Sequence, residues 1–598
     1  MPDVLFMPSD EPFVPKRPTT CRTSDTIPSV NEQEQAESVW QRIRIRMGQN
    51  GPAAKPNDHE LAVQTGREKK MSKGKKKQGS AGTADAPLEE RISGILKQMS
   101  LQDKCRLLNG GEEFATQDYQ KQYGVPRMEL SDGPNGLRKQ EAGANHLGLG
   151  GSIRATCFPT AATVANSWDP SLGEEIGRAL AEECSAAGVS VLLGPGLNMK
   201  RSPLCGRNFE YFSEDPYLAG KMAAGYIRGT QESGLSACPK HFAVNNQERL
   251  RMSCDSVVDE RTLREIYLTG FEIAVKEGHP KSIMTSYNPV NGTYANENRH
   301  LLCDILRGEW GYDGMVVTDW GGSNDHVEGV RATSDLEMPV PGPDSAGMLV
   351  KAVKDGTLSE EIIDARVREL LRLILPTAEA LGSMPDTFDE EMHHAVARKA
   401  AARSIVLLKN DGGLLPLAAG TKVAVIGDFA QTPRYQGAGS SMVNPTRLDN
   451  LLECLQSEED LEIAGYAQGF KRHGGEDAAL KQEALKMARQ ADVICCCLGL
   501  DEIKESEGLD RSDMKINENQ VRLLHELAAT GKKIVVVLSG GSAVETPWID
   551  DCDALMGIRW DCCCRMFTGF EPDCDKTGQK QGMPAGAGFW YDSDRLSR

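Results

Sequence analysis

The chain has 598 residues and a formal net charge of −18 at pH 7, with 26% charged and 39% hydrophobic residues. This balance is that of an ordinary globular protein, and a chain of this length predicts several domains. The negative charge argues against binding to nucleic acid or to an anionic membrane surface. No run of about 18 uninterrupted apolar residues occurs, so we expect no transmembrane helix. The first residues lack a basic start followed by an apolar core, so we expect no signal peptide.

Residues 1–85 differ in composition from the rest of the chain. They are rich in Pro, Gln, Ser, Thr and Lys and have few periodic apolar runs, which is typical of a solvated, disordered tail. The basic segment Arg67–Lys77 could instead tether the protein to nucleic acid or a membrane. A third interpretation is that translation starts at Met71. Because no export signal precedes them, the 17 cysteines are expected to be mostly reduced thiols in a cytoplasmic protein.

From about Leu88 onward, short apolar runs alternate with helical stretches. The pattern of buried strands occurs at residues 128–132, 189–195, 238–244, 282–287 and 314–319, and helical patterns at 172–187 and 260–277. This alternation predicts a parallel α/β sheet covered by helices, either open or closed into a barrel. Polar residues lie where the expected strands end, namely Asp132, Lys240, His241, Tyr287 and Asp319. In a barrel these ends form one face, where active sites are built.

A helix expected over residues 390–408 leads into a second α/β region. Its core strands are expected at 423–428, 491–500 and 532–540, and their nearly continuous apolar character indicates a sheet covered on both faces. No G-x-G-x-x-G motif opens a helix there, so a nucleotide fold is not favoured. After about Trp560 the pattern is lost. The adjacent cysteines 562–564 and Cys574 lack the spacing of a zinc site.

Two groups of carboxylates occur in unusual surroundings. Asp319 ends an apolar strand and is followed by Trp320 and two glycines, and an indole beside a carboxylate is a familiar platform for sugars. The alternative is that Asp319 caps the next helix. Four acids, Glu505, Glu507, Asp510 and Asp513, lie in the polar loop 504–514, which could also be a solvated loop. Two carboxylates that face one bond are what glycoside hydrolysis requires.

The remaining polar residues of these segments suit the hydroxyl groups of a sugar. Carboxylates accept hydrogen bonds, lysine and arginine donate them, and histidine does either. The residues concerned are Asp132, Asp215, Arg207, Lys240 and His241.

Six motifs occur in the order of a known family. They are SDGPNGLR (131–138), GPGLNMKRSPLCGRNFEYFSEDP (194–216), KHFAVNNQE (240–248), MTSYNPVNG (284–292), VVTDWGG (316–322) and ESEGLDR (505–511). Through them the chain resembles glycoside hydrolase family 3, in its β-glucosidase branch, over roughly residues 88–560. The resemblance implies a (β/α)8-type TIM barrel at 86–378, a linker and helix at 379–408, and an α/β sandwich at 409–560. An irregular tail would follow at 561–598.

The resemblance also implies a mechanism. Asp319 would be the nucleophile that forms a covalent glycosyl-enzyme, and Glu507 the general acid/base, which together give retention of configuration. Asp319 must be ionised, and Lys240, His241 and Arg207 are expected to hold its pKa low, whereas Glu507 must start protonated. Neither a metal nor an organic cofactor is required.

The same resemblance assigns the sugar-binding residues and the substrate class. Asp132 would hold the 4- and 6-hydroxyls of a terminal glucose, and Arg207, Lys240 and His241 would bind the 2-, 3- and 4-hydroxyls. Tyr287 would lie against Asp319, while Met284 and Trp320 would shape the −1 and +1 subsites. Glu214 and Asp215 could instead be structural. The expected substrate is a small-molecule or oligosaccharide β-glucoside, and the alternatives are a β-xylosidase or an α-arabinosidase.

The C-terminal part departs from the family pattern. The family continues beyond residue 560 with further sandwich elements, so a truncated or frameshifted reading frame is one expectation. An incomplete sandwich would expose apolar sheet and an unpaired edge, and the chain could then be a non-catalytic remnant. Homo-oligomers are also compatible with the sequence.

Overall fold

The structure is a computed structural model, and it describes residues 86–141, 151–340 and 344–558. The expectations for the tail 1–85, the start at Met71, the cysteines 562–564 and the segment 561–598 lie outside the described residues.

The first domain is built on short parallel strands. β3 (Leu130–Ser131), β5 (Val191–Leu192) and β6 (Ser236–Ala237) pair in one sheet, and β7 (Ser282–Met284) pairs with β10 (Met315–Val317). Parallel bridges continue the series, joining Phe242 to Thr285 and Val317 to Leu336. The third strand therefore lies at 236–237 rather than at 238–244, where the chain already forms a loop. The smaller paired strands are β1 (Gly110–Glu112) with β2 (Ala115–Thr116), β8 (Pro289–Val290) with β9 (Thr293–Tyr294), and β4 (Arg154–Ala155) with β13 (Asn444–Pro445).

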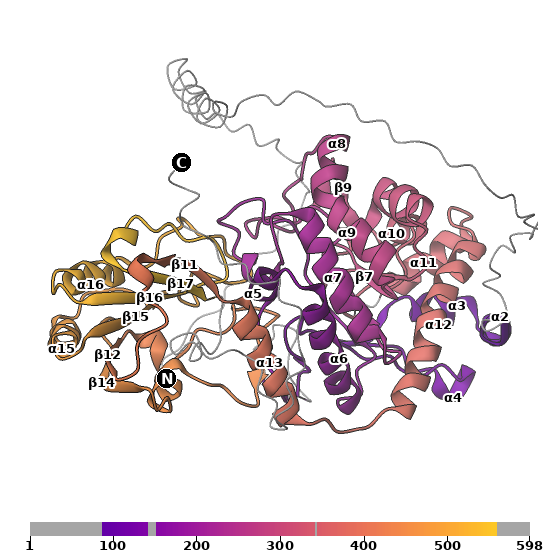
Figure 1. The fold of residues 1–598 in the computed structure, drawn as a ribbon. Helices are drawn as coiled ribbons and strands as arrows, with labels where there is room; N and C mark the ends of the chain where they lie inside the picture. The colour runs from indigo at the N-terminus through magenta and orange to yellow at the C-terminus, as the bar shows by residue number, and fades with distance from the viewer. Residues whose placement is uncertain (1–85, 142–150, 341–343, 559–598) are drawn as a thin grey trace, which may run out of the picture. The chain divides into compact units, whose positions relative to one another are not determined.

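Helices surround these strands (Figure 1). Their bounds are α2 Ala86–Gln98, α3 Leu101–Leu107, α4 Gln120–Tyr123, α5 Ala161–Val164, α6 Pro170–Ala186, α7 Pro216–Gln231, α8 Glu260–Thr262, α9 Thr269–Ile273, α10 His326–Arg331, α11 Ser345–Lys354 and α12 Glu360–Ser383. The helix expected at 260–277 runs through α8, η3 (Leu263–Leu268), α9 and η4 (Ala274–Gly278), with π-type turns. Another π-type helix, η6, spans His300–Glu309.

Successive strand residues contribute to different hydrophobic cores. Leu192, Ile283 and Val316 belong to a core shared with α6 and α7, whereas Val191 and Val317 belong to one that includes residues of α3 and α12. Side chains alternate between the two faces of a strand, so each strand separates the two cores. Both cores are buried, which leaves the loops after the strands to carry polar side chains.

The second domain is a six-stranded sheet in the order β11-β17-β16-β15-β12-β14, parallel except for β11. The strands are β11 Val406–Asn410, β12 Thr421–Ile426, β14 Leu461–Ala467, β15 Val493–Gly499, β16 Lys533–Ser539 and β17 Ala554–Ile558. The helices of this domain include α14 (Leu451–Gln456), α15 (Ala478–Ala488) and α16 (Glu518–Ala528). Figure 1 shows α15 and α16 beside the sheet. Every residue of β15 is buried, which confirms the prediction of a sheet covered on both faces. Exposed apolar surface lies instead on the edge strand β11, where Leu408 is 56% exposed.

The helix between the domains is shorter than expected. α13 spans Glu390–Ser404, and Ile405 already has extended backbone angles. Val406 and Leu407 pair with β17, so residues 406–408 belong to the sandwich sheet and not to the linker helix. The helical spacing of the leucines could not reveal this pairing, because the partner strand lies about 150 residues away. The preceding helix, α12, also continues past residue 378 to Ser383.

A buried histidine joins α13 to the barrel. His393 Nδ1 lies 2.8 Å from Glu183 Oε1, and its Nε2 lies 3.0 Å from Glu182 Oε2 on α6. The ring of Phe388 stacks on the imidazole, with centroids 5.0 Å apart. Burial opposes a charged imidazole, but hydrogen bonds to the two glutamates raise the pKa of His393 overall. Only the imidazolium donates to both carboxylates, so the link is strongest when His393 is charged.

We expect the substitution His393→Gln to destabilise the protein, and more so at low pH. Removing one partner of a buried ion pair costs about 3 kcal/mol. The folded-state pKa is raised, so this stabilisation is fully present below the unfolded pKa of about 6.5 and is lost as pH rises through the folded pKa. Thermal unfolding of both proteins at pH 5.5 and 8.5 checks this, with the exposed His279→Asn as control. An equal difference in Tm at both pH values would contradict it.

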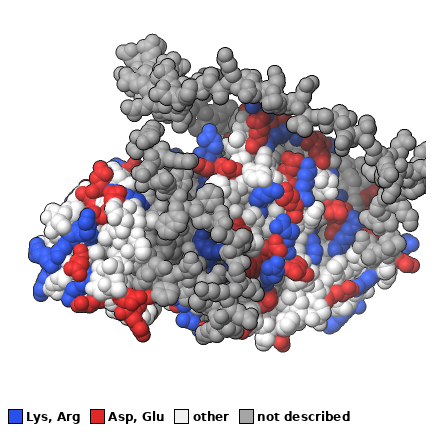
Figure 2. Space-filling model, viewed as in Figure 1, with Lys and Arg blue, Asp and Glu red and all other residues white. Residues whose placement is uncertain are grey.

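The surface gives two further observations. On the face shown in Figure 2, acidic and basic side chains of the described residues interleave, and no extended basic area forms among them. Among the described helices, none is both long enough and apolar enough to cross a bilayer.

Candidate active site

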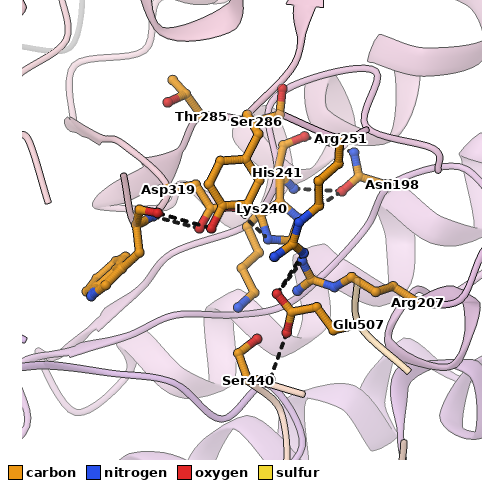
Figure 3. Close-up of polar contacts among 12 residues, drawn as sticks. Asn198, Arg207, Lys240, His241, Arg251, Thr285, Ser286, Asp319, Ser440 and Glu507 are labelled. Atoms are coloured by element: carbon orange, nitrogen blue, oxygen red, sulfur yellow. Dashed lines mark hydrogen bonds and ion pairs between the residues drawn. The ribbon is translucent and has the colours of Figure 1, made fainter. Parts of the chain in front are cut away.

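Asp319 lies two residues after the last residue of β10, at the carboxyl end of that strand, and Figure 3 shows the polar side chains around it. Its Oδ1 accepts a hydrogen bond from Trp320 N at 2.8 Å. Its Oδ2 lies 3.5 Å from His241 Nε2 and is buried without a hydrogen-bond partner. The alternative role as a helix cap does not apply, because the side chain of Asp325 caps α10. One oxygen of Asp319 is therefore fixed by the backbone, and the other is unpartnered.

The aromatic residues beside Asp319 are held by backbone carbonyls. Tyr287 donates from its hydroxyl to Trp320 O at 3.2 Å, and Trp320 donates from its indole nitrogen to Glu113 O at 2.8 Å. The ring of Phe114 packs on the indole, with centroids 5.0 Å apart. These contacts place Tyr287 and Trp320 next to Asp319, and for Tyr287 this is the position that the family resemblance implies. Met284 is buried at the end of β7 in the core that includes Val317, and its role at the subsites stays a prediction.

His241 is fixed by a single asparagine. The backbone N and the Nδ1 of His241 lie 2.8 and 3.2 Å from Asn198 Oδ1, and Asn198 Nδ2 donates to His241 O at 2.8 Å. Burial and the nearby cations Arg207, Lys240 and Arg251 hold the pKa of His241 well below its usual value. The imidazole is therefore neutral and adds no positive charge beside Asp319.

The pKa of Asp319 is also different from the expectation. Burial raises it above the usual value, and Arg207, Lys240 and Arg251 only oppose that rise. The prediction that its neighbours hold this pKa low is thus wrong in direction, because the side chain is only 10% exposed and desolvation outweighs the cations.

Lys240 connects two further carboxylates of the barrel. Its Nζ lies 3.8 Å from Asp132 Oδ1 and 3.6 Å from Glu210 Oε1, while Glu210 Oε2 pairs with Arg207 at 2.7 Å. Burial raises the pKa of Asp132 to about 6 despite Lys240 and Arg138. Asp132 is hence mostly ionised at pH 7 and accepts hydrogen bonds there. Glu210, which pairs with both cations, was not singled out from the sequence, because it lies in the single 3-10 turn η2 (Asn208–Glu210), which is too short to show a periodic pattern.

Glu507 reaches the same group of side chains from the sandwich (Figure 3). It lies in the loop after β15, and its Oε2 accepts a hydrogen bond from Ser440 N at 2.7 Å. Its Oε1 lies 2.7 Å from Arg251 Nη1 and 3.4 Å from Arg207 Nη1. Gly439 permits this approach, since a Cβ there would lie 2.4 Å from the Cβ of Glu507. Both carboxylates predicted to act therefore meet one cluster of cations.

The protonation state of Glu507 corrects a second expectation. Burial raises its pKa, but the charges of Arg207 and Arg251 and the bonds from Ser440 outweigh burial and hold the pKa far below its usual value. Glu507 is consequently ionised in this state and does not start protonated. If a group of the substrate draws Arg251 away from Glu507, the pKa of Glu507 rises, and this carboxylate can then hold a proton.

Arg251 is the main site residue that sequence reasoning missed. Besides Glu507, it pairs with Glu248 at 2.9 Å, and its guanidinium lies over the ring of Tyr287, 4.8 Å from the centroid. It follows Lys240 by eleven residues in an irregular loop, where no strand or helix pattern predicts which side chain points to the site.

We expect Arg251→Met to move the alkaline limb of the pH profile of kcat/KM to higher pH. Arg251 lowers the pKa of Glu507, so its removal raises that pKa and leaves more of the acid protonated near neutral pH. Initial rates between pH 4 and 9 measure the shift. The control is Arg249→Met, because Arg249 is exposed. An unchanged alkaline limb would show that Arg251 does not set this protonation.

The other candidate carboxylates bind backbone or ion partners. Glu505 is buried and accepts from Gly541 N at 2.9 Å, Asp513 accepts from Lys515 N at 2.8 Å, and Asp215 caps α7. Asp510 binds three backbone N–H groups of the barrel. Within the described ranges, no group of three His, Cys, Asp or Glu residues could hold a metal ion.

A barrel and an α/β sandwich that bring one carboxylate each to a cluster of hydroxyl-binding side chains define the class of two-domain glycoside hydrolases. Residues 109–373 match the glycosyl hydrolase family 3 N terminal domain, and residues 405–559 match the glycosyl hydrolase family 3 C-terminal domain. The chain belongs to glycosyl hydrolase family 3. This confirms the barrel and sandwich fold.

Individual relatives give the same result. A thermostable beta-glucosidase B of Acetivibrio thermocellus is 48% identical over 461 residues, which cover 77% of this chain and 61% of that protein. An exo-alpha-(1->6)-L-arabinopyranosidase of Bifidobacterium longum is 43% identical over 77% of this chain and 62% of that protein. The crystal structure of a GH3 beta-glucosidase of Bifidobacterium adolescentis has a TM-score of 0.73 and 42% identity, over 77% of this chain and 66% of that one. The chain spans about three fifths of the length of each of these two curated relatives.

Proposed function

We propose that the protein is a retaining, exo-acting β-glucosidase that releases terminal β-D-glucose. The observation that carries this proposal is that Asp319 of the barrel, beside His241, and Glu507 of the sandwich, paired with Arg207 and Arg251, lie in one group of polar side chains (Figure 3), with Asp319 Oδ2 free of hydrogen bonds. Glycoside hydrolysis needs two carboxylates whose surroundings give them different pKa values, so that one attacks the sugar and the other transfers the proton.

In the proposed first step, Asp319 Oδ2 attacks the anomeric carbon, and the bond to the aglycone oxygen breaks. Glu507 delivers a proton to that oxygen. Because the free carboxylate is ionised, Glu507 must first take up a proton from solvent, as the arriving substrate takes Arg251 away from it. In the second step Glu507, now ionised again, removes a proton from water. The water then attacks the glycosyl-enzyme and releases Asp319 and the sugar with its original configuration.

The sugar is proposed to be held by the charged barrel residues. Asp132 accepts from hydroxyl groups, Lys240 donates to them, and neutral His241 does one or the other. Asp132 in this place supports a sugar that carries a 6-hydroxymethyl group, in line with the family resemblance. The relatives named beta-glucosidase support glucose.

A second candidate is an α-L-arabinopyranosidase, because a relative with 43% identity carries that name. The experiment is a panel of 4-nitrophenyl glycosides: β-D-glucoside, β-D-xyloside, α-L-arabinopyranoside and α-L-arabinofuranoside. The proposal expects the highest kcat/KM for the β-glucoside and release of β-glucose first, as seen by proton NMR. Initial release of α-glucose would exclude retention, and a faster arabinopyranoside would favour the second candidate.

Cytoplasmic location, homo-oligomers, and the lack of nucleic-acid and membrane partners stay predictions from the sequence. The non-catalytic alternative is tested by the same panel, since it expects no turnover of any glycoside.

A further inference from the structure

The loop that carries Glu507 is attached to the barrel by a neighbouring acid. The carboxylate of Asp510 accepts three hydrogen bonds from barrel backbone N–H groups. Its Oδ1 lies 3.2 Å from Gly206 N and 2.9 Å from Glu248 N, and its Oδ2 lies 2.9 Å from Arg249 N. Bonds from N–H groups to a charged carboxylate are about twice as strong as neutral ones. Asp510 thus joins the sandwich loop to two separate barrel loops.

These two barrel loops also carry the cations that bind Glu507. Gly206 immediately precedes Arg207, and Arg249 lies two residues before Arg251. Glu507 itself lies three residues before Asp510, and its Oε1 pairs with both arginines. One carboxylate therefore fixes the distance between the acid and its two ion-pair partners, although they come from different domains.

The loop also donates two hydrogen bonds from its own backbone N–H groups to oxygen atoms of the barrel. Glu248 Oε2 accepts a hydrogen bond from Gly508 N at 2.7 Å, and Leu204 O accepts one from Arg511 N at 2.8 Å. Gly206 lies so close to the loop that a Cβ there would be 1.7 Å from Leu509 O and 2.4 Å from Ser506 O. The barrel thus holds the loop at Gly508, Asp510 and Arg511, directly after Glu507, and a side chain at 206 would push the loop away.

We propose that Asp510 is a positioning residue for proton transfer, which holds Glu507 at the aglycone oxygen of the substrate. This inference rests on the proposed function. A displacement of about 1 Å in a reacting group costs on the order of 10²-fold in rate. Asp510 touches no substrate atom in this proposal. Its loss acts only through Glu507, so it affects those substrates whose leaving group needs the proton.

The test compares Asp510→Ala and Asp510→Asn with the unaltered full-length chain. The control is Asp477→Ala, because Asp477 also accepts from two backbone N–H groups, Ala479 and Leu480, but caps α15 within the sandwich. We measure kcat/KM for a 2,4-dinitrophenyl β-glucoside and for an alkyl β-glucoside. The Asp510 variants should lose about 10²-fold on the alkyl glucoside and only a few-fold on the activated one. Inhibition by glucose should change less than about three-fold, and the control should not alter the ratio of the two rates.

An equal loss on both substrates, or no loss on the alkyl glucoside, overturns the proposal. If Asp510→Ala fails to fold, Gly206→Ala displaces the same loop from the barrel side and is expected to give the same leaving-group dependence. If the unaltered chain hydrolyses no glycoside, the proposed function fails separately. In that case, hydrogen exchange at the amides of Gly206, Glu248 and Arg249 tests whether Asp510 attaches the loop to the barrel. Faster exchange in Asp510→Ala than in Asp477→Ala supports the attachment, and equal exchange refutes it.

Discussion

Replacing Asp319 by Asn or Gly is expected to abolish hydrolysis, with a loss in kcat of roughly 10⁴- to 10⁶-fold, the range that loss of a catalytic residue acting as part of a unit can cost. Neither replacement carries the negative charge that attacks the anomeric carbon, and neither forms the ester intermediate. The fold should persist, because Oδ2 makes no hydrogen bond and Oδ1 binds only Trp320 N. Initial rates on 4-nitrophenyl β-glucoside measure the loss, and thermal unfolding confirms that the variant is folded.

The matched control is Asp325→Asn, six residues along the same segment. Asp325 caps α10 through its side chain, and Asn caps a helix about as well as Asp, so this replacement should leave both stability and kcat almost unchanged. A 2-deoxy-2-fluoroglucoside should label the unaltered protein on the peptide that contains Asp319. Label on another carboxylate, or more than about 1% of activity in Asp319→Asn, would assign the nucleophile elsewhere.

The second large effect is expected for Glu507→Ala, and its size should depend on the leaving group. General acid catalysis contributes about 10²- to 10⁴-fold, so alkyl glucosides should lose that much in kcat/KM. A dinitrophenolate leaves without a proton, and the first step on that substrate should slow little. Removing the carboxylate also opens space beside Arg251 and Arg207, to which Glu507 is bound.

Added azide should partly restore turnover of the activated substrate by Glu507→Ala. The anion needs no base to attack the glycosyl-enzyme, and the product should be β-glucosyl azide. The control is Asp513→Asn in the same loop, where the carboxylate binds a backbone N–H, the Ser512 hydroxyl and Lys504. Equal slowing of alkyl and dinitrophenyl glucosides by Glu507→Ala would remove Glu507 from the role of acid.

Predictions from the sequence succeeded where the local pattern was strong. The apolar runs around Val317, Cys495 and Val535 lie in β10, β15 and β16, because buried parallel strands need apolar side chains on both faces. Predictions failed where a distant partner decided the structure. Val406 and Leu407 have the spacing of a helix, but pairing with β17 draws them into the sheet.

The residues of the site also fall into those that the sequence predicted and those that it did not. The placement of Asp319 after an apolar strand followed from the sequence, and the family motifs pointed to Glu507. Met284 lies at the end of β7, where its side chain joins the core that includes Val317. Arg251 and Glu210 were missed because an irregular loop and a single 3-10 turn give no periodic signal for the direction of a side chain.

The sequence by itself determined the alternation of strands and helices, the two-domain α/β organisation, and the acidic and basic residues at the strand ends. These depend on local composition and spacing, which a single chain displays. The tertiary structure decided the charge states. Burial raises the pKa of Asp319, and Arg251 and Arg207 keep Glu507 ionised. It also decided that Asp510 binds the barrel backbone, because desolvation and contacts between residues hundreds of positions apart exist only in the folded chain.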